Sequence, residues 1–233
     1  MRAYPPQNPL RKLGQLIAFH RLLVIALTCW TAFACTAILM VMGYTARLDA
    51  WSLLAFRDAP ALTLSGPAWL SVAIRDMTAL GGFSVRNLLA IMAMAILLTL
   101  RRHRQVLVVL TAIVSGMLVE YWLKECFGRP RPAIVPHLMS INGNSFPSGH
   151  VFNGSVVYIS IALAFAGMSR KTTTRLMIMG TAIATCIMIG TTRVALGVHY
   201  LTDAVAGLVG GAGWALLVYA LLSSSPINPP ASP

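Results

Sequence analysis

The chain has 233 residues, of which 57% are hydrophobic and only 10% charged, and its mean hydropathy is +0.74. Soluble domains carry about 25% charged residues, so this composition excludes an ordinary soluble protein and indicates an integral membrane protein. The net charge is +12, but the basic residues form short clusters between apolar runs. This pattern is typical of topology signals and lipid headgroup contacts, so nucleic acid is not an expected partner.

The first apolar run follows a polar and basic segment, residues 1–21. Residues 22–42 carry no charge and are long enough to cross a bilayer, which requires about 20 residues. A cleaved signal peptide is the alternative, because Ala32-Phe33-Ala34 resembles a cleavage site. The run is longer than the apolar region of a signal peptide, about 7–15 residues, which favours an uncleaved anchor. The four cysteines show neither metal-ligand nor CxxC spacing, and we expect no disulfide framework.

Residues 43–82 are mixed in character. Within them, residues 61–74 are apolar but short and contain Pro67, which predicts an amphipathic or interfacial helix, with a further span as the alternative. Five later runs are predicted to cross the membrane: 83–100, 105–124, 150–168, 176–192 and 201–222. The sequence therefore predicts an all-α fold, a bundle of six transmembrane helices with an interfacial helix between the first and second spans.

The basic clusters predict the orientation of this bundle. With six spans, the N-terminus, residues 101–104 and residues 170–175 share one side, which the positive-inside rule makes cytoplasmic. Both termini are then cytoplasmic. The C-terminal ends of the third and fifth spans and the N-terminal ends of the fourth and sixth share the opposite face, and every unusual polar residue lies at one of these ends.

The first polar cluster covers residues 124–132. Lys124 and Arg131 are cations separated by a broken helix, and they either reach the lipid interface or bind a phosphate, with Arg131 holding it bidentately. Arg129 is a weaker candidate for the same role. Glu120 lies four residues before Lys124 and offers it an alternative partner.

The second cluster, residues 145–150, opens the fourth span. Pro147 and Ser148 are ordinary helix-start residues, whereas His150 is not explained by a helix start. The N-terminus of a helix suits phosphate oxygens, and Gly149 would let the backbone approach them. His150 is then placed to protonate a leaving oxygen.

The third cluster, residues 192–203, holds ionisable groups inside apolar sequence, which marks a functional site in a membrane protein. His199 and Asp203 are four residues apart and would share a face of a helix, so the aspartate can orient the imidazole and leave its other nitrogen free to attack. Arg193 precedes Gly197, which we expect to break the helix. Together the clusters suit phosphoryl transfer, in which catalysis is mostly positioning and charge stabilisation.

These three clusters resemble the signature of the type 2 phosphatidic acid phosphatase (PAP2) superfamily: Lys-x6-Arg-Pro, Pro-Ser-Gly-His and Ser-Arg-x5-His-x3-Asp. The matching residues are Lys124, Arg131 and Pro132, then Pro147, Ser148, Gly149 and His150, then Arg193, His199 and Asp203. The one departure is Thr192 in place of serine, which keeps the hydroxyl. The resemblance covers about residues 80–220, and residues 76–82 also look like the segment before the second span in bacterial members.

The resemblance implies a metal-independent phosphatase without cofactors. In it His199 is the nucleophile that forms a phosphohistidine, Asp203 orients it, and His150 protonates the leaving group and then activates water. The phosphate is held by Lys124, Arg131, Arg193, Ser148 and the Gly149 amide. Charge, hydropathy and composition predict the organisation: a cytoplasmic segment (1–21), a membrane phosphatase domain (22–222) with a periplasmic interfacial segment (43–82), and a flexible cytoplasmic tail (223–233).

Three other functions fit parts of the pattern. A metal hydrolase would use His150, His199 and Asp203 as ligands, but the nearby cations would repel a divalent ion. A serine hydrolase would use Ser148, but the Gly-x-Ser-x-Gly elbow is absent. A lipid-phosphate binder or carrier would keep the pocket without turnover.

The expected setting is a bacterial inner membrane, with the site on the periplasmic side. The candidate substrates there are undecaprenyl diphosphate, lipid A phosphate, phosphatidylglycerophosphate and phosphatidate. The motif residues recognise the phosphate and do not choose among these lipids.

Overall fold

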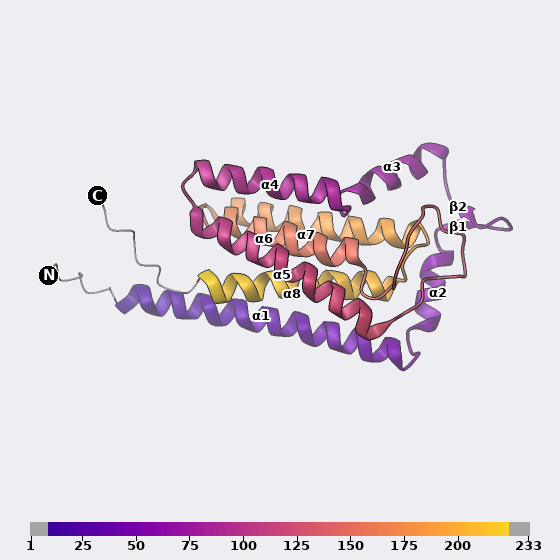
Figure 1. Cartoon of the computed structure of the whole chain (residues 1–233), viewed down its shortest axis with the longest axis horizontal. Coiled ribbons are helices and arrows are strands. Elements are labelled where there is room, and N and C mark those ends of the chain that lie inside the picture. Colours follow the sequence, from indigo (N-terminus) through magenta and orange to yellow (C-terminus); the bar gives the residue numbers. More distant parts are fainter. Residues whose placement is uncertain (1–8, 224–233) are drawn as a thin grey trace.

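The computed structural model describes residues 9–223, which form a bundle of antiparallel helices with smaller elements gathered at one end (Figure 1). The helices are α1 (Pro9–Val41), α2 (Ala46–Leu54), α3 (Ala68–Ala79), α4 (Phe83–Thr99), α5 (His103–Phe127), α6 (Gly149–Ala166), α7 (Thr172–Ala195) and α8 (Leu201–Ser223). Two short strands, β1 (Arg57–Asp58) and β2 (Thr63–Leu64), pair antiparallel. The predicted all-α helical bundle is confirmed, and in the part of the chain that the structure describes, α2 and this hairpin are additions to the predicted elements.

Five of the described helices are each long and apolar enough to cross a bilayer. Helices α3 and α4, which are bent by 50° relative to each other, would form a sixth span if they are counted as one broken helix. The bend follows from the residues at the break, where Gly82 is extended and precedes the first turn of α4. The predicted later spans match α4 to α8 to within a few residues, while α1 starts well before residue 22. Beyond Ser223, the predicted tail lies outside the described residues.

The segment between the first and second spans differs in detail from its prediction. A helix was expected over residues 61–74, but α3 begins only at Ala68, because Pro67 is extended and stands at its start. Residues 61–66 belong to the hairpin and the loop after it. Figure 1 shows α2, the hairpin and α3 together at one end of the bundle. An interfacial position for them stays a prediction.

Helix α8 lies at the centre of the bundle and packs against α1, α5, α6 and α7. Its contact with α6 is very close because two glycines face that helix. A Cβ on Gly211 would lie 2.2 Å from the carbonyl oxygen of Phe152, and one on Gly207 would lie 2.9 Å from that of Ser148. These glycines therefore bring the start of α6 against the start of α8, where two of the polar clusters lie.

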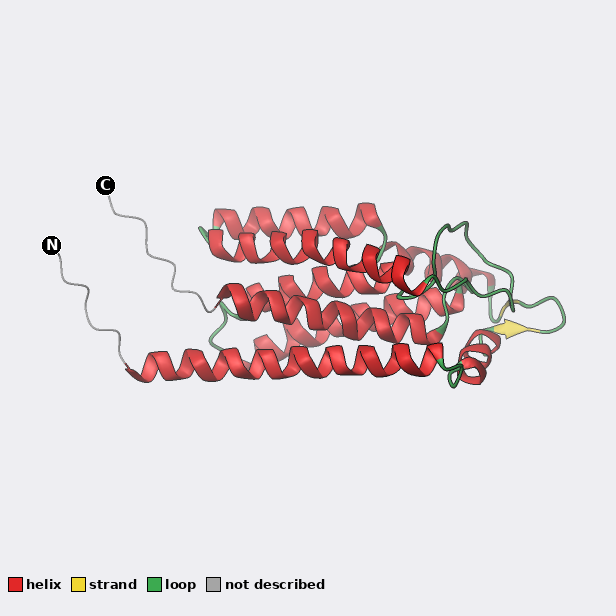
Figure 2. Cartoon of the chain, turned by 60° about the horizontal axis from the view of Figure 1, so that its bottom comes forward, coloured by secondary structure: helices red, strands yellow, loops and turns green. Residues whose placement is uncertain are grey.

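The helices alternate in direction, so polar clusters far apart in sequence share one end of the bundle (Figure 1). That end holds the C-terminal ends of α5 and α7 and the N-terminal ends of α6 and α8. Figure 2 shows the loops concentrated there, and α1 running along the length of the bundle. The basic residues 101–104 and 170–175 lie at the opposite end. There Arg104 donates hydrogen bonds to the Leu222 carbonyl and joins the start of α5 to the end of α8.

Candidate active site

His199 and Asp203 meet at the junction of α7 and α8. Helix α7 ends at Ala195, Gly197 turns the chain with φ +75°, and α8 begins at Leu201. The Nδ1 atom of His199 lies 3.4 Å from Oδ2 of Asp203, and both side chains are buried. The predicted pairing is therefore present, but the expectation that both residues share a helix is wrong. His199 lies in the turn, and only Asp203 lies in the helix.

The first turn of α8 holds the Asp203 carboxylate in place. The main-chain N–H of Tyr200 donates to Oδ2 at 2.9 Å, as in a capping box where a side chain reaches back to the residue before the helix. The Ser145 hydroxyl also donates to Oδ2, and its oxygen lies 3.3 Å from Nδ1 of His199. We did not single out Ser145 from the sequence, because a serine just before a helix start is ordinary.

The contacts of His199 define which of its nitrogens carries the proton. Nη1 of Arg131 lies 3.2 Å from Nε2 of His199. A guanidinium can only donate, so Nε2 bears a lone pair and Nδ1 carries the proton, directed toward Ser145 and Asp203. Burial lowers the pKa of His199 to about 4, although Asp203 opposes this effect. The imidazole is therefore neutral at pH 7 and has its lone pair on the nitrogen that faces Arg131.

The cations of the first cluster are fixed by the loop before α6. Arg131 donates to the carbonyl oxygens of Asn142, Gly143 and Val198, each at 2.9 Å. Lys124 donates to the carbonyl of Asn144 at 2.7 Å and also lies 3.6 Å from Glu120. The ion pair between Lys124 and Glu120 that the sequence suggested is therefore present. Lys124 nevertheless also reaches the loop beside His199.

Among the buried donors at this end that have no hydrogen-bond partner are Nε of Arg193 and the hydroxyl of Ser148, and Nε and Nη1 of Arg57 also lack one. Nη1 of Arg193 donates to the Thr78 hydroxyl at 3.3 Å and to the sulfur of Met139 at 3.0 Å. A buried donor without a partner is unfavourable by about 1–3 kcal/mol. A bound anion that accepted hydrogen bonds from Nε of Arg193 and the Ser148 hydroxyl would remove their deficit.

His150 lies in the first turn of α6, where it is within electrostatic range of His199, Arg193 and Arg131. The three clusters therefore converge, as the topology predicted. Gly149 has a further packing reason that the sequence did not reveal. A Cβ there would lie 2.5 Å from a carboxylate oxygen of Glu120, so a larger residue would require the Glu120 side chain to move.

Arg129 does not serve as the phosphate ligand considered from the sequence. Its guanidinium is bound to two carboxylates, Asp203 at 2.5 Å and Asp49 at 2.7 Å. Asp49 comes from α2 and had no predicted role. Among the described residues, no three His, Cys, Asp or Glu side chains come together in a metal-binding arrangement.

Comparison with known proteins agrees with this geometry. The model of the PAP2 superfamily matches residues 105–225. The chain is 31% identical over 160 residues to phosphatidylglycerophosphatase B of Bacillus subtilis (strain 168), covering 66% of this chain and 74% of that protein. It is 32% identical over 121 residues to lipid A 1-phosphatase of Rhizobium etli, covering 48% and 47% of the two chains.

Two crystal structures share the architecture. A transmembrane PAP2 type phosphatidylglycerolphosphate phosphatase from Bacillus subtilis superposes with a TM-score of 0.75 at 26% identity, over 84% of this chain and 94% of that one. LpxE of Aquifex aeolicus superposes with a TM-score of 0.57 at 24% identity, over 73% and 94%, and shares the fold. The family model covers more than half of the chain, and the three clusters that carry its signature meet at one end of the bundle. The chain therefore belongs to the PAP2 superfamily and is a multi-pass membrane phosphatase.

Proposed function

We propose that the chain hydrolyses the phosphomonoester or diphosphate headgroup of a lipid through a phosphohistidine on His199. The observation that carries this proposal is the neutral His199 imidazole, with its lone pair beside Arg131 and its Nδ1 proton directed to Ser145 and Asp203. The lone pair on Nε2 of His199 is thus a nucleophile, and the neighbouring Arg131 is a cation that would attract the phosphate.

In the first step, Nε2 of His199 forms a bond to phosphorus while the bond from phosphorus to the leaving oxygen breaks. His150 gives its proton to that oxygen. In the second step, His150 takes a proton from water, the hydroxide attacks phosphorus, and the P–N bond breaks. Its electron pair returns to Nε2 and inorganic phosphate leaves. Asp203 stabilises the positive charge that develops on the imidazole in between.

The phosphate is held by Arg131, Lys124, Arg193, Ser148 and the Gly149 amide. Support for this assignment comes from the unpartnered Nε of Arg193 and hydroxyl of Ser148, because these donors lack a protein acceptor. The start of α6 adds main-chain N–H groups and the positive end of its dipole. Preorganised donors of this kind stabilise the charge of a phosphoryl-transfer transition state.

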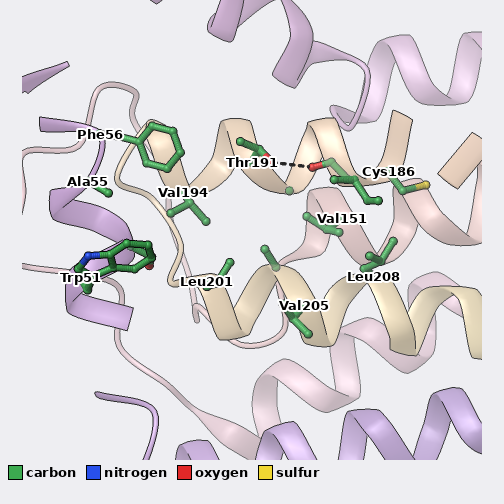
Figure 3. Close-up of a pocket in the computed structure, with 14 residues that line it drawn as sticks. Trp51, Ala55, Phe56, Val151, Cys186, Thr191, Val194, Leu201, Val205 and Leu208 are labelled. Carbon is green, nitrogen blue, oxygen red and sulfur yellow. Dashed lines mark hydrogen bonds between the residues drawn. The ribbon is translucent and has the colours of Figure 1, made fainter. Parts of the chain in front are cut away.

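An apolar groove of about 300 Å³ lies beside the site and supports a lipid substrate. Figure 3 shows it between α7 and α8, with Trp51 and Phe56 at one end and Cys186 and Leu208 at the other. Val194 and Leu201, which border the turn that carries His199, line the end near Trp51. From Val194 to Cys186 the groove follows α7 for about 12 Å.

We assign this groove to one hydrocarbon chain of the substrate. Ile187 and Val205 line it and are also exposed on the outside of the bundle, so a chain can enter directly from the bilayer. Trp51, exposed at the end near the site, is a residue typical of the membrane–water interface. The phosphate would then lie at the headgroup level and the chain below it.

We further propose that the site faces the periplasm of a bacterial inner membrane. The basic residues 101–104 and 170–175 lie at the end of the bundle opposite to the site (Figure 1). Because the cytoplasmic side of a membrane protein is rich in Lys and Arg, that opposite end would be cytoplasmic.

The test is a phosphate-release assay with the purified protein on four lipids: phosphatidylglycerophosphate, lipid A phosphate, undecaprenyl diphosphate and phosphatidate. The first two correspond to the names of the relatives of this chain. We expect turnover of at least one lipid by the native protein and none by His199→Ala. Binding of these lipids without release of phosphate by the native protein would contradict the proposal and favour a carrier.

A further inference from the structure

A buried carboxylate outside the three clusters is bonded to the catalytic end of α8. Asp49 of α2 is only 1% exposed. It accepts hydrogen bonds from the main-chain N–H of Thr202 at 3.0 Å and from the Thr202 hydroxyl at 2.8 Å. The hydroxyl of Thr45, the residue just before α2, also donates a hydrogen bond to the Asp49 carboxylate, at 3.2 Å. Asp49 therefore satisfies one of the free N–H groups at the start of α8, next to Asp203.

Arg129 connects this carboxylate to Asp203. Its Nη2 donates to Asp49 at 2.7 Å and its Nη1 to Asp203 at 2.5 Å. The guanidinium lies 4.0 Å from the centre of the Tyr200 ring, which fixes its plane. Burial works to lower the pKa of Arg129, but Asp203 and Asp49 outweigh burial and raise it. Arg129 is therefore a permanent cation shared by two carboxylates.

The sharing determines how much negative charge His199 experiences. Asp203 paired with Arg129 alone would form a neutral pair, which cannot offset the positive charge that develops on His199 during attack. Asp49 adds a second negative charge, so the three side chains together carry a net charge of about −1 at neutral pH. Of the described residues, the charged groups that act on His199 besides Asp203 are Arg131 and Arg193, and both are cations. The next carboxylate, Glu120, is paired with Lys124.

We propose that Asp49 is a positioning residue that balances the charge of Arg129, so that Asp203 remains an effective anionic partner for His199. Among the described contacts, no hydrogen bond or ion pair joins Asp49 to His199, and Asp49 acts through Arg129 and Thr202. The proposal rests on the proposed role of His199 as the nucleophile. It also assigns a catalytic contribution to α2, the helix that lines the near end of the lipid groove.

The test compares kcat and KM of Asp49→Asn with those of the double variant Asp49→Asn/Arg129→Gln on a substrate that the native protein hydrolyses. Asp49→Asn keeps the size of the side chain but leaves Arg129 to neutralise Asp203. We expect kcat to fall about tenfold or more, with KM changed less than threefold. The double variant restores the net charge of about −1, and we expect its kcat to be at least threefold higher than that of Asp49→Asn alone.

Thr45→Val is the matched control, because it removes a hydrogen bond to Asp49 without changing any charge. We expect its kcat to stay within about threefold of the native value. Thermal unfolding in detergent, followed for all variants, shows whether a loss of kcat accompanies a loss of fold.

Three outcomes overturn the proposal: Asp49→Asn retains native kcat, the double variant is no better than the single one, or Thr45→Val loses as much kcat as Asp49→Asn. The last two would reduce Asp49 to a structural cap of α8. His199→Ala, measured in parallel, separates this inference from the proposed function. An active His199→Ala protein refutes the nucleophile itself, whereas an inactive one together with a native-like Asp49→Asn refutes only the role of Asp49.

Discussion

The main-chain N–H of Ser148 donates a hydrogen bond to the main-chain carbonyl of Asp203 at 3.0 Å. This bond joins the start of α6 to the start of α8. The phosphate-binding loop and the carboxylate behind the nucleophile are therefore parts of one connected unit, so small changes at the α6–α8 contact will affect the geometry of the site.

Replacement of His199 tests the nucleophile. His199→Ala should lower the rate of phosphate release by more than about 10⁴-fold, because it removes the lone pair that attacks phosphorus. The native protein, quenched in base during turnover, should carry substrate phosphate on the protein, and the variant should carry none. A labelled His199→Ala protein would contradict the assignment.

Ser145→Ala should lower kcat by about 10- to 100-fold with KM nearly unchanged, because the hydroxyl is bonded to Asp203 and lies beside Nδ1 of His199, the side of the ring away from the attacking nitrogen. Steady-state kinetics at saturating lipid give this measurement. An effect mainly on KM would instead make Ser145 a substrate-binding residue.

His199 should become protonated only at an unusually low pH. Burial lowers the pKa of His199 to about 4, so its neutral, nucleophilic form is present above that pH and is lost only as the pH falls through about 4. An ordinary imidazole with a pKa of about 6.5 would already be mostly protonated at pH 5.5. Nitrogen-15 NMR of labelled protein in detergent, with His199→Ala to assign the signal, measures the value directly. A midpoint near 6.5 would show that the imidazole is solvated.

Filling the groove should affect lipids selectively. Thr191→Phe places a ring in the groove from an exposed position on α7, and it should reduce kcat/KM for a long-chain lipid phosphate by about tenfold. Activity on a water-soluble phosphate ester should stay unchanged. Thr181→Phe, also exposed on α7 but outside the groove, is the control and should affect neither substrate. Equal losses on both substrates would remove the chain-binding role.

The α6–α8 contact should tolerate no added carbon. Gly211→Ala should lower the free energy of unfolding by about 1–3 kcal/mol, because the new Cβ would meet the Phe152 carbonyl. Gly180→Ala on α7 has no atom within 4 Å of the added Cβ and should be neutral or slightly stabilising. Thermal unfolding in a common detergent compares the two variants, and equal melting temperatures would contradict the packing argument.

The sequence by itself determined the membrane class, the approximate spans and the convergence of the three clusters. These follow from local properties. Apolar runs of sufficient length must cross the bilayer, and each crossing reverses the chain. The positions of Lys124, His150 and Asp203 near span ends thus predict that they share one face of the membrane, and the motif spacing indicates the family.

Only the tertiary structure decided how the site is held together. The bonds from Asp49 to Arg129 and Thr202, and from Ser145 to Asp203, join residues 58 to 153 positions apart, so no local spacing reports them. The turn at Gly197 takes His199 out of the helix that its spacing to Asp203 suggested. Long-range hydrogen bonds and packing depend on how helices settle against one another, and this is why the sequence indicated which residues gather but not which of them bear on the nucleophile.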